Sequence, residues 1–398
     1  FGLATNPYFV QPLNSSDDGP RPISLFKGRA SEGKGLASSI ASEETSLNVV
    51  EAPSGVGKST FVNYVKFRLR DRYFAPPLEV GVQSDWNATA VLLAVLDVLV
   101  KHASDLNPDA KWPRDFPAIA RARELVTSIQ HSGWGVSFGL QPATPIGASV
   151  GLSRQTTGQR PLIGPVLSPA FFADLVQDLL AMSTPPKDGV ILHVNNLDTL
   201  MAASVRQTRT LISDLRDYFQ VTNLHWILVG PPGLQADALA PERRVMSVVK
   251  EAIQLDKLPP ADLEAFLQSR YEHYALPHAT PTEPTDPKLV REIYSLFGGD
   301  LRGTLNALTR AHRYFDPVDV APLRRLDGLE ILAGHFRAHL LQALAAKPQR
   351  VLDHLTKLGA EEFTQDDAKP IEKFQSARSK HFSDLEQWDA IRLVRTEG

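Results

Sequence analysis

The sequence contains no cysteine, and this absence excludes several kinds of site. Disulfides, thiolate metal ligands and cysteine nucleophiles cannot form. The histidines do not supply a substitute, because they are scattered and no His-Glu-x-x-His sequence occurs. His193 stands inside an apolar run, so we expect a hydrogen-bonded core residue there instead of a metal ligand. A chain without cysteine also fits a reducing compartment, and we expect a cytoplasmic protein.

The sequence also lacks a charge excess and a long hydrophobic run. Its formal net charge is −3 over 398 residues, so bulk positive charge does not indicate nucleic-acid binding. The most apolar helical stretch, Ala88 to Val100, is short and carries Asp97, which favours a buried helix over a membrane span. The length allows two or three domains. We therefore expect a soluble protein without membrane contact.

One motif is present in a form that predicts a specific ligand. The sequence "NVVEAPSGVGKSTFVNYV" places a β-branched apolar run, Leu47 to Val50, before a glycine-bearing loop. After the loop, Phe61, Tyr64, Val65 and Leu69 recur at helical spacing. A strand, a loop and then a helix is the context that a P-loop requires. The alternative, an ordinary glycine turn before a helix, does not account for the adjacent Lys-Ser-Thr.

The residues of this loop match the chemistry of a triphosphate. Gly55 and Gly57 allow positive φ and let backbone N–H groups approach phosphate oxygens. Lys58 is expected on the β- and γ-phosphates, and the Ser59 hydroxyl on Mg²⁺. Ala52 stands where the strict pattern has its first glycine. We predict that ATP or ADP binds with Mg²⁺ to the loop residues Ser54, Gly55, Val56, Gly57, Lys58, Ser59 and Thr60.

Further motifs follow in a fixed order. "GVILHVNNLDTL" (189–200) is an apolar strand that ends in a polar cluster, and "LHWILVGPPGL" (224–234) is another buried strand. "APERRVMS" then predicts a basic helix end, and "FGGDLRGTLNAL" (297–308) puts Arg302 at the start of a helix. A P-loop ATPase needs an acid at the end of the first of these strands, where this chain has Asn195 and Asn196. Asp198 is the nearest carboxylate there.

This order resembles the AAA+ ATPases, closest to their origin-recognition and initiator-like clade. The stretch "NPYFVQPL…LFKGRASE" is similar to that clade's N-terminal segment, and the likeness covers about residues 6–315. It implies an α/β fold with a P-loop parallel sheet core of AAA+ type, a helical lid and a C-terminal winged-helix-like domain. We place the core at 1–258, the lid and its linker at 259–345, and the winged-helix-like module at 346–398.

The resemblance also implies roles for three arginines. Arg302 corresponds to the sensor-2 arginine that contacts the γ-phosphate from the lid. Arg244, or Arg243 beside it, corresponds to the finger that a neighbouring subunit presents, so self-association is expected. A guanidinium suits both roles because its fork pairs with phosphate oxygens. The alternative for each residue is an ordinary solvated surface arginine.

The departures from the family pattern concern hydrolysis. Asn195 brings no charge to Mg²⁺, and Asn196 cannot accept a proton, unless Asp198 substitutes. A general base typically contributes about 10²–10⁴ in rate. The sensor-1 position falls in Pro231-Pro232-Gly233, which has no side chain to orient water. We predict tight nucleotide binding with slow or partner-dependent turnover, and whether ATP is hydrolysed to ADP and phosphate stays open.

Two further segments indicate partner contacts. Over 132–154, Trp134, Val136, Phe138 and Leu140 alternate with small residues, which predicts a hairpin with an apolar face. This hairpin either packs on its own domain, is buried in an oligomer or meets a protein partner. In 346–398, three helices and a strand resemble a winged helix that stops before a complete wing. Its candidate DNA contacts are Ser376, Arg378, Lys380 and His381.

Three functions agree with these features. The first is an AAA+ nucleotide switch coupled to DNA through the winged helix, in replication, transposition or anti-phage defence. The second is a signalling-type ATPase that oligomerises and binds protein partners instead of DNA. The third is a scaffold in which the nucleotide is structural.

Overall fold

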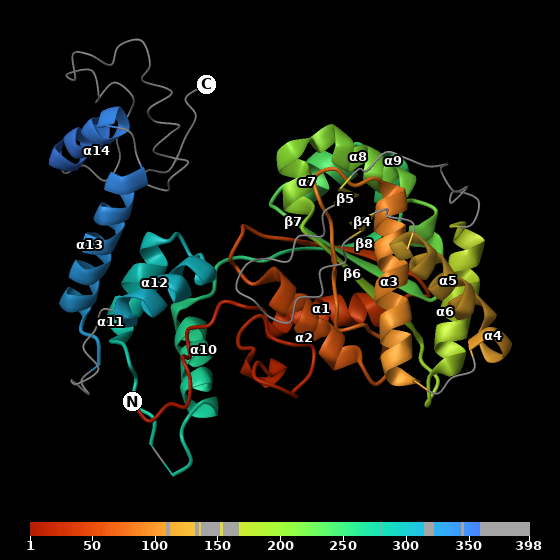
Figure 1. The fold of residues 1–398 in the computed structure, drawn as a ribbon, viewed down its shortest axis with the longest axis horizontal. Helices are drawn as coiled ribbons and strands as arrows, with labels where there is room; N and C mark the ends of the chain where they lie inside the picture. The colour runs from red at the N-terminus through yellow and green to blue at the C-terminus, as the bar shows by residue number, and fades with distance from the viewer. Residues whose placement is uncertain are drawn as a thin grey trace. The chain divides into compact units, whose positions relative to one another are not determined.

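The protein, described as a computed structural model, forms two compact units, one of residues 1–283 and 291–306 and the other of 284–290 and 307 onward (Figure 1). The structure describes residues 1–108, 112–131, 135–136, 152–153, 167–278, 280–313, 322–343 and 346–358. The first unit contains the P-loop and most of the segments that the sequence assigns to the core. Helices α11 (Pro287–Leu296) and α12 (Leu301–Arg313) contribute residues to both units.

A parallel sheet forms the centre of the first unit. Its strands run in the order β2-β6-β7-β1-β8, and β3 also pairs with β6. Every pairing is parallel, and β1, β6 and β7 are almost entirely buried, which explains why the sequence shows them as apolar runs. The bounds are β1 Ser46–Glu51, β2 Tyr73–Phe74, β3 Val80–Gly81, β6 Gly189–Asn195, β7 Leu224–Gly230 and β8 Val249–Gln254.

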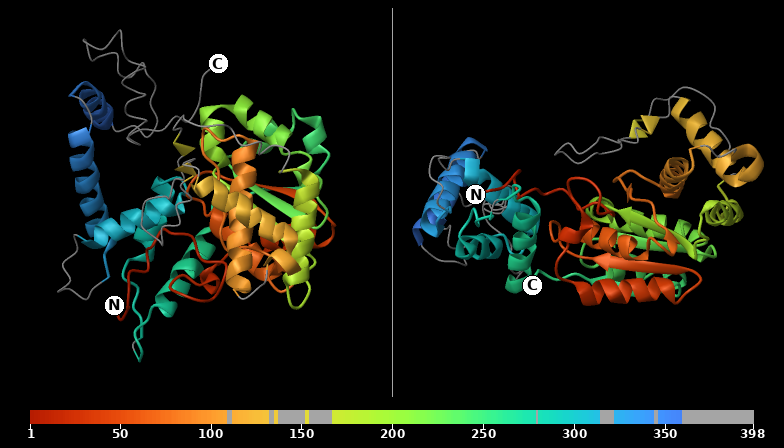
Figure 2. Two further views of the ribbon diagram at one scale, coloured as in Figure 1. Left: turned by 45° about the vertical axis from the view of Figure 1, so that its right-hand side comes forward. Right: turned by 90° about the horizontal axis from the view of Figure 1, so that it is seen from below.

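Helices cover both faces of this sheet (Figure 2). Helices α1 (Ala30–Ala41) and α2 (Lys58–Leu69) pack on the face that carries Val50, Ile191 and Ile227. The opposite face carries Val49, Leu192 and Leu228, and it packs on the other helices. Those helices are α3 Ala88–Leu106, α5 Pro117–His131, α6 Pro169–Met182 and α8 Val205–Asp214. Because side chains alternate along a strand, odd-numbered β6 residues lie on the α1 and α2 side.

The second core strand is shorter than the sequence predicts. The stretch "PLEVGVQSDW" (77–86) predicts one core strand, but the structure has two strands of two residues each, β2 and β3, beside β6. Pro76 and Pro77 lie between them and have no backbone N–H to donate to a ladder. The helix after them begins at Ala88, as expected, with the Asn87 side chain as its N-cap.

The remaining elements follow the sequence with shifted boundaries. After β7 come the short helix α9 (Arg243–Met246), β8 and α10 (Pro260–His273). Helix α10 and the first residues of α12, both predicted in the lid, belong to the first compact unit. Where the sequence predicts a hairpin, the structure pairs β4 (Gly135–Val136) with β5 (Leu152–Ser153) in antiparallel orientation, and the rest of 132–154 lies outside the described residues.

The second unit is helical where it is described. It contains α13 (Arg325–Ala343) and α14 (Ala346–Leu358), and Thr285 forms an isolated parallel bridge with Leu323. The predicted winged-helix segment after residue 358 lies outside the described residues. None of the described helices combines the length and the hydrophobicity that a membrane crossing requires.

Candidate nucleotide-binding site

The P-loop connects the end of β1 to the start of α2. Gly55 has φ +80° and Gly57 has φ +102°, conformations that L side chains rarely adopt. Gly57 is the N-cap of α2, so the free N–H groups of the first helical turn begin at this point. The need for glycine at Gly55 is also steric, because an added Cβ would overlap the Asp300 carboxylate. The loop therefore has the conformation that a phosphate-binding loop requires.

Lys58 is held at the loop by backbone carbonyls. Its Nζ donates to Ala52 O at 2.8 Å and to Pro53 O at 3.2 Å, and it lies 4.0 Å from Asp198 Oδ2. Burial lowers the pKa of Lys58, while the Asp198 carboxylate raises it and the positive charge of Arg302 lowers it further. An anion beside Lys58 would compensate this desolvation.

A cavity of about 550 Å³ opens over the loop, within the size range of ligand pockets. One part of its lining is polar and includes the loop, Asn195 and Asp198. The other part is largely apolar and comes from the N-terminal segment and from residues after β8, among them Phe9, Val10, Phe26, Leu258 and Phe266. The cavity thus suits a ligand with an anionic end and a flat apolar end.

Two buried arginines fasten the N-terminal segment to this site. Arg29 has φ +57° and donates from Nη1 to Val56 O at 3.0 Å and from Nη2 to Asp256 O at 2.7 Å. It therefore joins the P-loop to the segment after β8. Arg270 of α10 donates to Pro7 O and Phe9 O, each at 2.9 Å. Neither arginine has a role that the sequence alone predicts, and the only signal for them is Gly28-Arg29 in the segment that resembles the family.

Arg302, to which the sequence resemblance gives the sensor-2 role, lies beside the P-loop. Its backbone N–H donates to Gly55 O at 3.3 Å, and its exposed side chain lines the cavity with Lys58. Asp300 accepts a hydrogen bond from Gly303 N at 3.0 Å, which caps α12. The contact with γ-phosphate that the resemblance implies for Arg302 stays a prediction.

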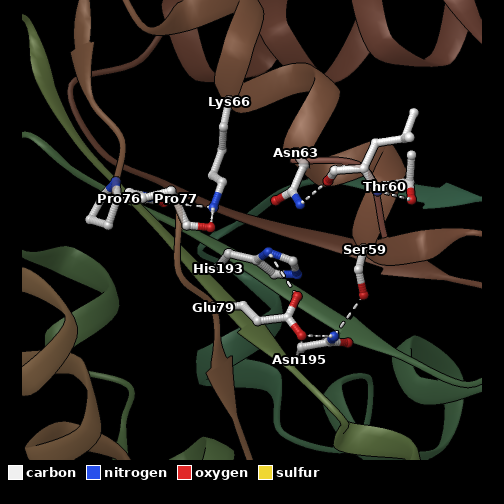
Figure 3. A network of polar contacts seen from close by, with 10 residues as sticks. Ser59, Thr60, Asn63, Lys66, Pro76, Pro77, Glu79, His193 and Asn195 are labelled. Carbon is white, nitrogen blue, oxygen red and sulfur yellow. Dashed lines mark hydrogen bonds and ion pairs between the residues drawn. The ribbon is translucent and has the colours of Figure 1, made fainter. Parts of the chain in front are cut away.

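The end of β6 contacts the P-loop helix through the Asn195 amide, which also binds the carboxylate of Glu79, a residue with no role assigned from the sequence. Asn195 is the last residue of β6 and is buried, and its Nδ2 donates to Ser59 Oγ and to Glu79 Oε1, both at 2.8 Å (Figure 3). Glu79 comes directly before β3. The register pairs Gly81 with Asn195, so Glu79 falls beside His193 on the same face of the sheet. A carboxylate just before the strand that neighbours β6 was the signal available in the sequence.

Behind Glu79 lie two buried basic side chains. Lys66 of α2 donates to Pro76 O at 2.6 Å and to Pro77 O at 3.2 Å, and burial lowers its pKa to about 8. The His193 Nδ1 lies 3.6 Å from Glu79 Oε2, and burial, followed by the charge of Lys66, holds the pKa of His193 well below its ordinary value.

One expectation for His193 is wrong. It is a core residue, but neither ring nitrogen has a hydrogen-bond partner in the described structure, because its nearest acceptor, Glu79, is too distant.

The other candidates at this strand end occupy the start of the next helix. Asn196 has φ +65° and is the N-cap of α7 (Leu197–Ala203), without a side-chain cap hydrogen bond. Asp198 stands in the first turn of α7 and faces Lys58 at 4.0 Å. Pro231-Pro232-Gly233 follows the end of β7. A catalytic role for Asn195, Asn196 or Asp198 stays a prediction.

The predicted finger arginines do not line the described cavity. Arg243 and Arg244 begin α9 and are exposed, and neither lines the cavity. An exposed position is required of a residue that reaches another subunit, so their role stays a prediction. The candidate DNA contacts Ser376, Arg378, Lys380 and His381 lie outside the described residues.

The cavity offers oxygen ligands that fit Mg²⁺. Ser59 Oγ and the carboxylates of Glu79 and Asp198 line it, and Mg²⁺ prefers such hard oxygen ligands. Among the described residues, no group of three or more His, Asp or Glu side chains could hold a metal ion alone. A Mg²⁺ ion at Ser59 would therefore need phosphate oxygens and water to complete its shell.

Solved structures that are similar to this chain over most of its length include three ORC proteins. The Aeropyrum pernix ORC1 protein in complex with DNA is 15% identical, with 92% of this chain and 84% of that chain covered and a TM-score of 0.47. The Aeropyrum pernix ORC2 protein with ADPNP and ADP is 12% identical, with 98% and 92% covered and a TM-score of 0.49. Drosophila ORC bound to DNA is 14% identical, with 98% and 84% covered and a TM-score of 0.44.

No protein family model matches the chain, and no curated protein matches it. At these identities and TM-scores the likeness concerns the fold alone. The parallel P-loop sheet predicted from the sequence is present in the structure. The solved structures are ORC proteins, in agreement with the resemblance to origin-recognition and initiator-like AAA+ ATPases as a likeness of fold.

Proposed function

We propose that this protein is an AAA+ type nucleotide switch that binds ATP with Mg²⁺ and turns it over slowly or only with a partner. The observation that supports this most directly is the convergence of three features on one cavity. These are the glycine loop with its left-handed residues, the desolvated ammonium of Lys58, and Arg302 joined to the loop through Gly55 O. Each of them favours a polyphosphate.

The shape of the cavity supports a complete nucleotide as the ligand. The triphosphate occupies the loop in this proposal, and the base lies toward Phe9, Phe26 and Leu258. Mg²⁺ bound at the Ser59 hydroxyl would balance phosphate charge. Because the N-terminal segment and α10 form the walls and Arg29 ties the wall to the loop, an occupied cavity stabilises the closed arrangement of the first unit.

Slow turnover follows from the residues at the end of β6. Asn196 has no basic oxygen to take a proton from water, and the Asp198 carboxylate faces Lys58. A missing general base typically lowers the rate about 10²–10⁴-fold. Phosphate release at ordinary AAA+ rates by the protein alone would contradict this part of the proposal.

Calorimetry with ATP and Mg²⁺ tests the binding function. We expect heat of binding with the parent protein and none with Lys58→Ala, while Lys34→Ala on the exposed side of α1 binds as the parent does. Both substitutions remove one lysine, so net charge is matched. If the parent gives no heat, or if Lys58→Ala binds equally well, the proposal is wrong.

The proposal also includes DNA binding by the nucleotide switch. ORC1 of Aeropyrum pernix and ORC of Drosophila are described in complex with DNA, and this chain shares their fold. We propose that the predicted winged helix contacts duplex DNA through Arg378 and Lys380. Salt-sensitive duplex binding that Arg378→Ala with Lys380→Ala abolishes would support this. ATP-dependent self-association without DNA affinity would support the signalling-type switch instead.

A further inference from the structure

The family pattern places an acid at the end of β6, but this chain has Asn195 there, so the negative charge for Mg²⁺ must come from elsewhere or be absent. Among the described residues that line the cavity, the carboxylates are those of Glu79, Asp97 and Asp198. Asp97 is paired with Lys101 at 2.6 Å, and Asp198 faces Lys58. Glu79 is the carboxylate on the Ser59 side of the cavity.

We propose that Glu79 is the carboxylate of the Mg²⁺ site, supplied from the strand beside β6 in place of the acid that Asn195 lacks. The inference rests on the proposed nucleotide function and names a residue that binds the metal or its water shell. Ser59 Oγ and Glu79 Oε1 are bridged by one amide group, Asn195 Nδ2, at 2.8 Å from each. A metal bound at Ser59 therefore lies within reach of Glu79 oxygens directly or through one bound water.

The backbone register explains how the acid can move to another strand. In a parallel pair, side chains of neighbouring strands in register point to the same face. Gly81 is paired with Asn195, so Glu79 and His193 fall in the preceding pair on that face, two residues before the strand end. The face is the one that α2 covers, and α2 carries Ser59 in its first turn. Glu79 therefore points to the helix that bears the metal-binding hydroxyl (Figure 3).

The surroundings of Glu79 indicate a carboxylate that is able to reorient. Lys66 places a buried positive charge behind it, and its ammonium donates to two carbonyl oxygens and to no carboxylate of the described residues. His193 is buried, neither of its ring nitrogens has a hydrogen-bond partner among the described residues, and its Nδ1 lies 3.6 Å from Glu79 Oε2. A buried polar ring without a partner is costly, and a small movement of Glu79 would give it one.

This arrangement resembles the support that metal-binding carboxylates and histidines receive in other proteins, where a further polar group fixes the ligand. Here one oxygen of Glu79 contacts Asn195 and the other faces His193. In the proposal, binding of Mg²⁺ and nucleotide draws Oε1 toward the metal, and His193 and Lys66 act as positioning residues. No step of bond making or breaking is assigned to Glu79.

The test measures ATP affinity by calorimetry with excess Mg²⁺ and with EDTA. In the parent we expect at least tenfold tighter binding with Mg²⁺. Glu79→Gln should lose most of this gain, because the negative charge that binds Mg²⁺ has been removed. Its affinity for ATP in EDTA should stay within about threefold of the parent's. Asp85→Asn, an exposed carboxylate in the loop after β3, is the matched control and should keep the whole gain.

A charge relocation makes the result specific. Glu79→Gln combined with Asn195→Asp returns the acid to β6, and we expect it to restore the Mg²⁺-dependent gain to within threefold of the parent. Mn²⁺ binding in the presence of ATP, followed by electron paramagnetic resonance, should show the same order of variants. This readout is independent of turnover.

Several outcomes would overturn the proposal. An undiminished Mg²⁺ gain in Glu79→Gln would show that the carboxylate is not part of the metal site. A gain lost in Asp198→Asn but kept in Glu79→Gln would assign the role to Asp198. Loss of binding in EDTA as well would show that Glu79 supports the loop and not the metal. If the parent binds no ATP under either condition, the proposed nucleotide function fails, which is a separate result.

Discussion

The contact between Gly55 and Asp300 allows a quantitative test of how the P-loop is coupled to the start of α12. Gly55 has φ +80°, and a Cβ there would overlap the Asp300 carboxylate. Gly55→Ala therefore introduces a left-handed alanine, which costs about 1–2 kcal/mol, and an overpacked contact, which costs about 1–3 kcal/mol. We expect this variant to lose about 3 kcal/mol of stability in the first unit.

Asp300→Ala separates the cost of the left-handed backbone from the cost of the overpacked contact. It removes the cap that Asp300 gives to Gly303 N, at a cost of about 1 kcal/mol. If the two sites were independent, the double variant would lose the sum of about 3 and about 1 kcal/mol, which is about 4 kcal/mol. Because the overlap requires the carboxylate, we expect instead that Gly55→Ala with Asp300→Ala loses only about 2–3 kcal/mol from strain and the lost cap.

Urea unfolding followed by tryptophan fluorescence measures these differences, since Trp86 and Trp226 are buried in the first unit. The decisive comparison is between Gly55→Ala and the double variant, which should be equally stable or more stable. Additive losses would show that Asp300 and the loop do not meet in solution.

Three further predictions concern pH, a buried charge and turnover. Burial lowers the pKa of His225 from 6.5 to about 4, so the unfolded chain binds the proton first as pH falls. The contribution of His225 to stability is therefore complete above about pH 6.5 and falls toward pH 4, by about 2 kcal/mol at pH 5. In urea unfolding at pH 7.5 and at pH 5, His225→Asn should show a smaller loss of stability between the two pH values than the parent does. Lys66→Met leaves the carbonyls of Pro76 and Pro77 without a donor, and we expect the free energy of unfolding to fall by about 2 kcal/mol in thermal or urea unfolding. Unchanged stability would show that burying the Lys66 charge costs as much free energy as its hydrogen bonds contribute. Asn195→Asp with Asn196→Glu should raise phosphate release by at least tenfold in a steady-state assay, and an unchanged rate would count against the placement of these residues beside the γ-phosphate.

The P-loop strand, its helix and the two other long strands could be predicted because each leaves a strong local pattern. β1, β6 and β7 are buried on both faces and therefore read as continuous apolar runs, and the glycine loop has few alternatives. Arg302 could be placed at the start of a helix because the Gly-Asp before it is a typical helix start. These signals depend on neighbours in the chain.

The polar group around Glu79 could not be predicted in the same way. Glu79, Ser59 and Asn195 are separated by 20 or more residues and meet only through the register of a strand that is two residues long. A strand this short has no period to recognise, and the sequence suggested one long strand from 77 to 86 instead. The buried His193 was misjudged for the same reason, because its partner depends on the position of Glu79.

The acid at the usual strand end has two functions, which are to supply charge to Mg²⁺ and to act as a general base. In the proposal this chain keeps the first function and lacks the second, so strong nucleotide binding and slow turnover can coexist. In the proposal, Glu79 supplies charge on the Ser59 side, where it stabilises bound Mg²⁺ in ground state and transition state alike. Such uniform binding raises affinity without raising the rate of the chemical step. A base on the opposite side is what Asn196 lacks, and its left-handed N-cap position allows little freedom to bring another group there. A partner that contributes a base or an arginine would then control hydrolysis, so turnover should respond to assembly far more strongly than nucleotide affinity does.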